Sequence, residues 1–200
     1  MRIPFYFDYA CPWAYLGSCR VDSTFRDLGC EIEARPVHLA TLKEPSAGKG
    51  PEAGPRKAAH YLNDLRHWAE MIGAEISPNA RSVMRSDTRL ALRATLVARD
   101  QGRDRAFRLA AYRARWGEAR DLSERATLRE LLAQSGLAAD AVLAAAESPE
   151  LGRRLERDTR DAIARGVFGV PTLLVGDRLF WGNDRFELAR YFVQKESGAG

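Results

Sequence analysis

Short apolar runs near both ends of the chain enclose a long stretch of helical repeats. Residues Phe5 to Tyr9 (FYFDY) have the aromatic character of a buried strand, and Pro12 supplies the fixed φ angle of a first helical turn. A helix is therefore predicted from Trp13 to Leu28. Residues 31–39 alternate between polar and apolar in their first half, which predicts a second strand. Strand, helix and strand in this order favour a parallel pair with a right-handed crossover.

Helical periodicity then continues almost without interruption to about Arg165. Helices are predicted over residues 58–72, 90–97, 104–116, 123–134, 140–147 and 149–165. Ser86 or Asp87 can cap the second of these, and Ser148 with Pro149 makes a good start for the last. Residues 43–55 (KEPSAGKGPEAGP) predict a surface loop, which either links two elements or covers a ligand cleft.

The last forty residues return to a strand pattern. Residues 169–175 and 178–181 predict two strands joined by the hairpin turn Gly176-Asp177, and a final helix follows over residues 185–194 with Asn183 or Asp184 as its cap. The order β-α-β, many helices, β-β-α predicts an α/β thioredoxin-like fold. Residues 1–50 and 160–200 are assigned to the thioredoxin-like domain, and residues 51–159 to an all-helical domain inserted between its halves.

Charge and composition narrow the class of protein. Of the 200 residues 46% are hydrophobic, which is enough for a sizeable core, and the net charge is +4. The arginines are spread along helical stretches, so they predict solvated helix faces rather than nucleic-acid binding. The excess of basic over acidic residues is also compatible with a basic entrance to a binding site for an anionic small molecule. Without a leader, a membrane-spanning run or a metal-ligand spacing of its three histidines, the chain is expected to be cytoplasmic, with no membrane partner and no metal.

Cys11 occupies the predicted N-cap of the first helix. A thiol there lies beside unpaired amide N–H groups and the positive end of the helix dipole, which favour the thiolate. The alternative is a small buried apolar residue at a strand end. Cys19 follows eight residues along the same helix, about 12 Å away at ~1.5 Å per residue, which is too far for a disulfide. The three cysteines are therefore expected to be reduced.

A proline opens the predicted strand at Val170-Pro171-Thr172. Since proline donates no hydrogen bond to a ladder, we expect either a cis Val–Pro bond at the sheet edge or a trans proline on an edge strand. In a thioredoxin-like layout this loop would face the Cys11-Pro12 turn.

Three segments carry a resemblance to a known family. FYFDYACPWAYLG, ARGVFGVPTLLV and LFWGNDRFEL resemble the 2-hydroxychromene-2-carboxylate isomerases and the kappa-class glutathione transferases, within the DsbA-like thioredoxin superfamily. The resemblance implies glutathione bound over the N-terminus of the first helix, and a homodimer. It also implies a glutathione-dependent isomerase or transferase that acts on an apolar or aromatic small molecule.

The resemblance also assigns roles to individual residues. Val170 matches the position whose backbone pairs with the cysteinyl part of glutathione, beside the cis proline at Pro171. Asp184 matches the acidic residue that holds the γ-glutamyl amine, and Asn183 stands where a glutamine is usual. Lys49 can approach a glutathione carboxylate in place of the family's asparagine. Independently of the family, a helix N-terminus suits a carboxylate and Asp184 suits an ammonium group, although Asn183 and Asp184 also suit helix caps.

The chain departs from the family at Cys11, where the isomerases and transferases carry a serine. Cys11-Pro-Trp-Ala14 also lacks the second cysteine of C-x-x-C, so a dithiol cycle has no resolving thiol. Three functions follow. Cys11 orients a glutathione thiolate in an isomerase or transferase, Cys11 is itself the nucleophile of a monothiol disulfide oxidoreductase, or the fold is a binding module without chemistry. Aromatic residues assigned either to the apolar side of the site or to the core are Phe7, Trp13, Tyr15 and Trp181.

Overall fold

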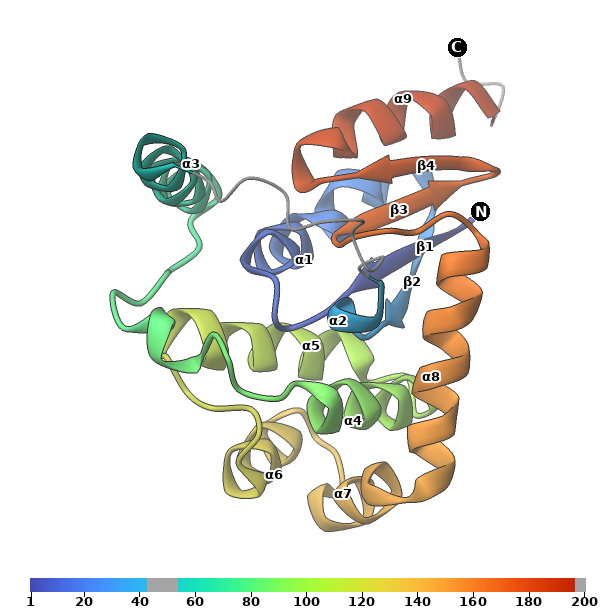
Figure 1. Cartoon of the computed structure of the whole chain (residues 1–200). Coiled ribbons are helices and arrows are strands. Elements are labelled where there is room, and N and C mark those ends of the chain that lie inside the picture. The colour runs from blue at the N-terminus through green and yellow to red at the C-terminus, as the bar shows by residue number, and fades with distance from the viewer. Residues whose placement is uncertain (43–53, 197–200) are drawn as a thin grey trace.

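A computed structural model of the chain describes residues 1–42 and 54–196 and shows a mixed four-stranded sheet (Figure 1). The strands lie in the order β2-β1-β3-β4. Strand β1 (Arg2–Phe7) is parallel to β2 (Glu31–Pro36), and β3 (Thr172–Val175) is antiparallel to both β1 and β4 (Arg178–Trp181). This topology confirms the predicted α/β thioredoxin-like fold.

Seven helices of the described chain lie between β2 and β3 in sequence. They are α2 (Leu39–Leu42), α3 (Pro55–Ile72), α4 (Arg89–Asp100), α5 (Asp104–Tyr112), α6 (Arg125–Gln134), α7 (Ala139–Glu147) and α8 (Pro149–Ala164). Helices α4 to α7 pack together, and α8 runs from this bundle back to the sheet (Figure 1). The predicted domain boundary between residues 159 and 160 falls inside α8, and the division into two domains stays a prediction.

None of the described helices is both long enough and apolar enough to cross a membrane. Helix α8 begins as predicted, because Ser148 Oγ accepts a hydrogen bond from Leu151 N at 3.3 Å.

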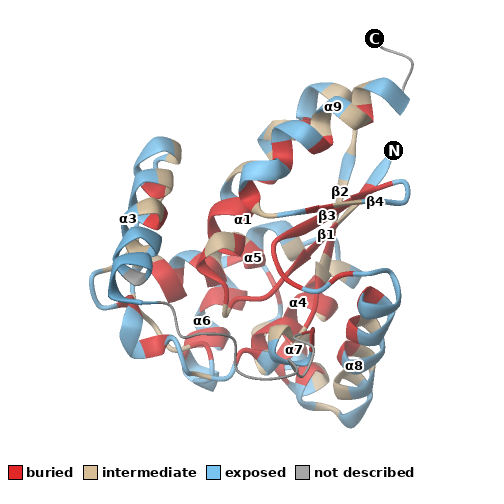
Figure 2. Ribbon diagram, turned by 45° about the horizontal axis from the view of Figure 1, so that its top comes forward, coloured by how far each residue is buried: buried red, intermediate tan, exposed pale blue. Residues whose placement is uncertain are grey.

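The core lies where the sheet meets α1 (Pro12–Phe25) and the helical bundle (Figure 2). Helix α9 (Phe186–Glu196) packs beside α1. Phe5 and Phe7 stack with ring centroids 5.7 Å apart, and the buried guanidinium of Arg108 lies over both rings. Its charge is paired with Asp22 at 3.0 Å, which compensates the cost of burial.

Two predicted strands end earlier than the sequence pattern indicated. Strand β1 stops at Phe7 rather than Tyr9, because the carboxylate of Asp8 accepts a hydrogen bond from Ala10 N and folds the chain into a turn. Strand β2 stops at Pro36 rather than Leu39, because Leu39 N donates to the same carboxylate and begins α2. A single buried side chain therefore sets both boundaries.

Other boundaries also differ from the predicted ones. The strand predicted over residues 169–175 begins only at Thr172, and the first helix ends at Phe25 rather than Leu28. Thr88, not Ser86 or Asp87, is the N-cap of α4. The predicted helix over 104–116 becomes α5 followed by a π-helical turn at residues 113–117. The last helix is preceded by a 3₁₀ turn over residues 183–185, whose N-cap is Gly182 at φ 109°, so the cap falls on neither Asn183 nor Asp184.

Gly17 lies where α1 packs tightly against Phe186 of α9 and Pro171 before β3. A Cβ atom at Gly17 would lie 3.2 Å from Phe186 Cζ and 3.3 Å from Pro171 Cβ. We expect Gly17→Ala to lower the free energy of unfolding, because overpacking of about 1–3 kcal/mol exceeds the helix-propensity gain of about 1 kcal/mol. Gly152→Ala in α8 is the control, since its nearest contact is 3.8 Å and we expect it to stabilise. Urea unfolding of both variants checks this, and stabilisation by Gly17→Ala would contradict it.

Candidate active site

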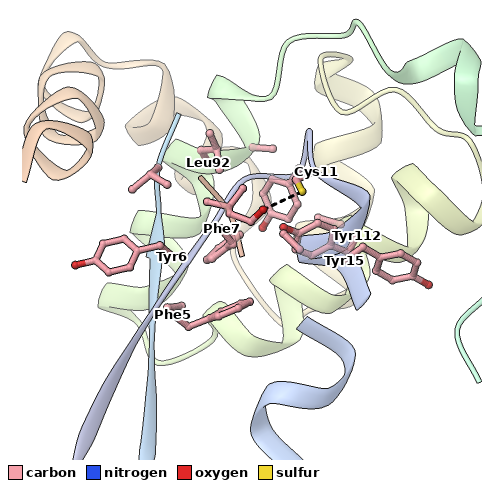
Figure 3. Packing of buried hydrophobic residues seen from close by; sticks show 14 of the residues in the cluster. Phe5, Tyr6, Phe7, Cys11, Tyr15, Leu92 and Tyr112 are labelled. Atoms are coloured by element: carbon pink, nitrogen blue, oxygen red, sulfur yellow. Dashed lines mark hydrogen bonds between the residues drawn. The ribbon is translucent and has the colours of Figure 1, made fainter. Parts of the chain in front are cut away.

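Cys11 lies at the N-cap of α1, where the sequence placed it. Its backbone is extended, with φ −104° and ψ 116°, and the residue is 8% exposed. The thiol donates a hydrogen bond to the carbonyl oxygen of Val170 at 3.2 Å. The Val170–Pro171 bond is cis, which is one of the two alternatives that the sequence left open. The two loops therefore face each other, and the sulfur lies at the edge of the aromatic core beside Tyr15 and Tyr112 (Figure 3).

The buried carboxylate of Asp8 anchors the turn before Cys11. Asp8 Oδ1 accepts hydrogen bonds from Ala10 N at 2.9 Å and from the Thr88 hydroxyl at 2.7 Å, and Oδ2 accepts one from Leu39 N at 2.8 Å. Burial raises the pKa of this carboxyl, although the three donors act in the opposite direction. Because Thr88 caps α4 and Leu39 begins α2, one side chain joins three segments beneath the thiol.

The helical bundle supports the same turn through its backbone carbonyls. The Tyr112 hydroxyl donates to Asp8 O at 2.8 Å, and Trp116 Nε1 donates to Tyr9 O at 2.9 Å. Burial raises the pKa of Tyr112 well above its ordinary value, so its hydroxyl stays protonated and can donate. The loop that carries Cys11 is thus held from the helical side as well as from the sheet.

A cleft of about 340 Å³ opens beside the Cys11–Val170 contact, and we call it the Val170 cleft. It brings together the predicted residues Trp13, Val170, Pro171, Trp181, Asn183 and Asp184. The lining residues that the sequence did not indicate are Asp64, Trp68, Gly182 and Arg185. Lys49 lies outside the described residues. This volume falls in the range of small-molecule sites.

Tyr15 and Phe7 lie in the core and are not part of the lining of the Val170 cleft. Tyr15 is 4% exposed, stacks on Tyr112 with centroids 5.8 Å apart and donates its hydroxyl to Glu75 O at 3.2 Å. Burial raises the pKa of Tyr15 to about 12. Phe7 is fully buried. The sequence assigned these two residues either to the apolar side of the site or to the core. The structure places both in the core.

Arg20 on α1 contacts two residues that line the Val170 cleft, Asn183 and Trp68, and no sequence motif indicated it. Its Nη1 donates to the backbone oxygen of Asn183 at 3.0 Å and to the side-chain oxygen of that residue at 3.3 Å, and its Nη2 pairs with Glu187. The guanidinium also lies over the Trp68 ring, 5.2 Å from its centroid. Arg20 therefore holds the turn that carries Asp184, while Asn183 is buried and committed to this contact.

A second cleft, of about 510 Å³, also reaches the α1 N-terminus, since Pro12 is part of its lining, and we call it the Trp116 cleft. Its lining is largely aliphatic and aromatic and comprises Pro12, Tyr61, Leu62, Leu65, Arg66, Ile76, Ser77, Pro78, Ala80, Arg81, Met84 and Trp116. The rings of Trp13 and Tyr61 meet edge to face with centroids 5.6 Å apart. Since Trp13 lines the Val170 cleft and Tyr61 the Trp116 cleft, this contact divides the two.

Cys11 has no resolving thiol in the described structure. The position three residues on is the fully buried Ala14. None of the three cysteines, all of which lie in the described part of the chain, forms a disulfide. Partial burial raises the pKa of the Cys19 thiol to about 11, so Cys19 is a protonated thiol at neutral pH. The geometry therefore supports one reactive sulfur rather than a dithiol pair.

The sequence matches the family of DSBA-like thioredoxin domains over residues 2–194. The chain belongs to this family. A curated relative, the 2-hydroxychromene-2-carboxylate isomerase of Sphingobium xenophagum, is 34% identical over 194 residues, which cover 96% of this chain and 97% of the relative. Relatives of this kind support an enzyme of the isomerase type.

Two solved structures share the fold. A 2-hydroxychromene-2-carboxylate isomerase superposes with a TM-score of 0.85 at 24% identity, over 100% of both chains. The cytosolic disulfide reductase DsbM from Pseudomonas aeruginosa, solved with GSH, superposes with a TM-score of 0.69 at 21% identity, over 98% of both chains. At these identities the likeness concerns the fold.

Proposed function

We propose that this protein is a glutathione-dependent isomerase or transferase of the 2-hydroxychromene-2-carboxylate isomerase type. The observation that carries the proposal is the Cys11 thiol at the N-cap of α1, directed at the Val170 carbonyl beside a small-molecule cleft. The isomerases among its relatives, matched over nearly their whole length, support the reaction class.

The charges of the Val170 cleft suit the γ-glutamyl end of glutathione, which carries an ammonium group and a carboxylate on the same carbon. Glutathione carries one ammonium group, two carboxylates and a thiol, and the cleft offers two carboxylates, Asp64 and Asp184, with one guanidinium, Arg185. Asp184 and Arg185 are 3.4 Å apart, so an ammonium and a carboxylate of one ligand can meet complementary charges side by side. Trp13, Trp68 and Trp181 add apolar walls.

Bound glutathione supplies a thiolate that can add to an activated double bond and leave again after rotation about the resulting single bond. The chain's own part is to orient that sulfur over the α1 N-terminus, where the helix dipole favours negative charge. Cys11 donates its S–H to a neighbouring acceptor, at present the Val170 carbonyl, and can donate to the thiolate in its place. The Trp116 cleft, which begins at Pro12, offers the apolar space for the acceptor.

A second function follows from the identity of residue 11. Here Cys11 is the nucleophile of a monothiol disulfide oxidoreductase. The Cys11 thiolate attacks the glutathione sulfur of a mixed disulfide between glutathione and a substrate thiol, a Cys11–glutathione disulfide forms, and the substrate thiolate leaves. A glutathione thiolate, rather than a protein cysteine, then attacks the bound glutathione sulfur, so that glutathione disulfide leaves and the Cys11 thiolate is regenerated. The buried Ala14 favours this exchange over dithiol chemistry.

Calorimetric titration with glutathione tests the site. Asp184→Asn is expected to weaken binding by about tenfold, because a charge-assisted hydrogen bond to the ammonium group is lost while the shape of the side chain is kept. Asp177→Asn, in the exposed β3–β4 turn, is the control and should bind glutathione like the unmodified protein. An unchanged affinity of Asp184→Asn would remove Asp184 from the site, and no binding by the unmodified protein would contradict the proposed function.

A further inference from the structure

We propose that a cavity between α2, α4 and α8 is a second ligand site, which takes a small hydroxylated molecule that carries a phosphate group. The cavity has a volume of about 640 Å³, larger than that of either cleft beside Cys11, and we call it the Arg93 cavity. Its walls come from the segments 38–41, 87–93 and 152–160. None of its lining residues in the described part of the chain also lines the Val170 cleft or the Trp116 cleft. The inference therefore does not rest on the proposed function.

The framework of the Arg93 cavity is fixed without a ligand. Helix α8 packs against both α2 and α4 (Figure 1). His38 N, just before α2, donates to the hydroxyl oxygen of Thr159 on α8 at 3.1 Å. Leu39 N at the start of α2 and the Thr88 hydroxyl at the start of α4 both donate to the buried carboxylate of Asp8. The three walls are thus held in place, so a ligand loses little binding free energy to ordering of the protein.

Arg93 of α4 brings a half-buried positive charge to this cavity. Its Nε donates to Arg89 O at 3.3 Å. Its Nη1 reaches across to α8, since a Cβ atom at Gly152 would lie 3.8 Å from it. No carboxylate within residues 1–42 and 54–196 forms an ion pair with Arg93. Partial burial of an unpaired charge is costly, and a bound anion would offset that cost.

Arg160 of α8 adds a second guanidinium to the lining, and it too has no ion-pair partner among the described residues. Arg89, which lines the same cavity, is neutralised by Asp87 at 2.6 Å. Arg154 of α8 is neutralised by Asp100 at 2.8 Å. Two guanidinium groups from separate helices can bind different oxygens of one tetrahedral dianion, whereas a flat carboxylate is matched by a single arginine. The two unpaired arginines therefore favour a phosphate group over a carboxylate.

The remaining polar groups of the lining suit hydroxyl groups. Glu156 of α8 has no ion-pair partner in the described part of the chain, and its carboxylate can accept hydrogen bonds from a ligand. One turn from Arg160, it also disfavours a second anionic group, so a single phosphate is expected. His38 Nδ1 lies 2.8 Å from the Thr41 hydroxyl oxygen, which leaves Nε2 for a ligand. The lining formed by described residues includes no phenylalanine, tyrosine or tryptophan, which favours a polar ligand body.

Glycerol 3-phosphate and glycerol are suitable probes, since they share the hydroxylated body and differ in the phosphate group. By calorimetry at low ionic strength, where exposed charges are least screened, glycerol 3-phosphate is expected to bind at least about tenfold more tightly than glycerol. Arg93→Gln and Arg160→Gln should each weaken binding of glycerol 3-phosphate severalfold, and the double variant should lose the preference for the phosphate. The matched control combines Arg153→Gln with Arg157→Gln. It removes the same charge from exposed positions of α8 outside the lining and should behave like the unmodified protein.

Gly152→Leu keeps both guanidinium groups but fills part of the cavity, so it should also weaken binding of glycerol 3-phosphate. Malonate, a dianion with two flat carboxylates, should bind more weakly than glycerol 3-phosphate, and equal or tighter malonate binding would overturn the phosphate assignment. Unchanged glycerol 3-phosphate binding in the double variant of Arg93 and Arg160 would overturn the site. Competition with saturating glutathione would also overturn it, by placing glycerol 3-phosphate in the Val170 cleft. The arginine variants test the cavity whether or not glutathione binds, so this inference and the proposed function can fail separately.

Discussion

Replacing Asp8 with alanine is expected to lower the free energy of unfolding by about 3–5 kcal/mol, because buried donors lose their acceptor. The carboxylate is 1% exposed and accepts hydrogen bonds from Ala10 N, Leu39 N and the Thr88 hydroxyl. Thr88→Ala removes one of these donors and should cost only about 1 kcal/mol. Urea unfolding measures both variants, and a loss below about 1 kcal/mol for Asp8→Ala would show that the turn does not depend on this side chain.

Asp8→Asn keeps the shape of the side chain but removes the titrating carboxyl group. Comparing the pH dependence of stability in this variant and in the unmodified protein therefore isolates the effect of the charge of Asp8. Because burial raises the pKa of Asp8 above its ordinary value of 3.8, the folded protein retains this proton at pH values where the unfolded chain has lost it. Its contribution to stability is therefore greatest at low pH and decreases as the pH rises through the folded-state pKa. The free energy of unfolding of the unmodified protein minus that of Asp8→Asn should therefore increase as the pH falls from neutrality towards 3.8. A difference that shrinks on acidification would contradict the assignment.

Cys11→Ala is expected to lower the turnover rate of glutathione addition by about 100- to 1,000-fold, because the donor to the developing thiolate is lost. Cys11→Ser keeps a hydroxyl donor at the same position and should retain activity. The measurement is the turnover of an activated aromatic acceptor with saturating glutathione. Calorimetry of the same variants shows whether glutathione remains bound.

The same pair of variants distinguishes the two proposed functions. In the monothiol function Cys11→Ser is as inactive as Cys11→Ala, since a hydroxyl forms no disulfide. Glutathione disulfide should then add one glutathione to the unmodified protein, visible by intact mass, and none to either variant. An active Cys11→Ser variant would favour the isomerase or transferase, and an inactive one with intact glutathione binding would favour the oxidoreductase.

The site is built from both parts of the chain, the thioredoxin-like part and the helical part that is inserted into it in the sequence. The thioredoxin-like part supplies Cys11, the cis Val170–Pro171 bond and the turn with Asp184. The helical part supplies Tyr112, which holds the turn before Cys11, and Tyr61, which divides the clefts. The chemistry that can occur at the thiol therefore depends on how α3 and α5 pack against α1.

Local sequence patterns were sufficient for the fold and for the centre of the site. Pro12 and Cys11 specify a helix start because proline has a fixed φ angle and needs no donor there, and Gly176-Asp177 specifies the hairpin. The parallel β1–β2 pair and the β3–β4 hairpin follow from the order of the elements, whereas the antiparallel pairing of β1 with β3 joins distant segments and was not predicted. The opposition of Cys11 and Val170, 159 residues apart, follows from the same topology.

Tertiary structure alone decided the rest, because the remaining contacts join residues whose individual patterns are uninformative. Asp8 resembled a strand residue, yet its burial and its three donors end β1 and begin α2. Arg20 and Asp64 resembled ordinary charged positions of solvated helices, and only the packing of α1 and α3 directs them to the Val170 cleft. The apolar periodicity of a helix predicts which of its faces is buried. Which cleft its polar face lines depends instead on how that helix packs against helices that are distant in the sequence.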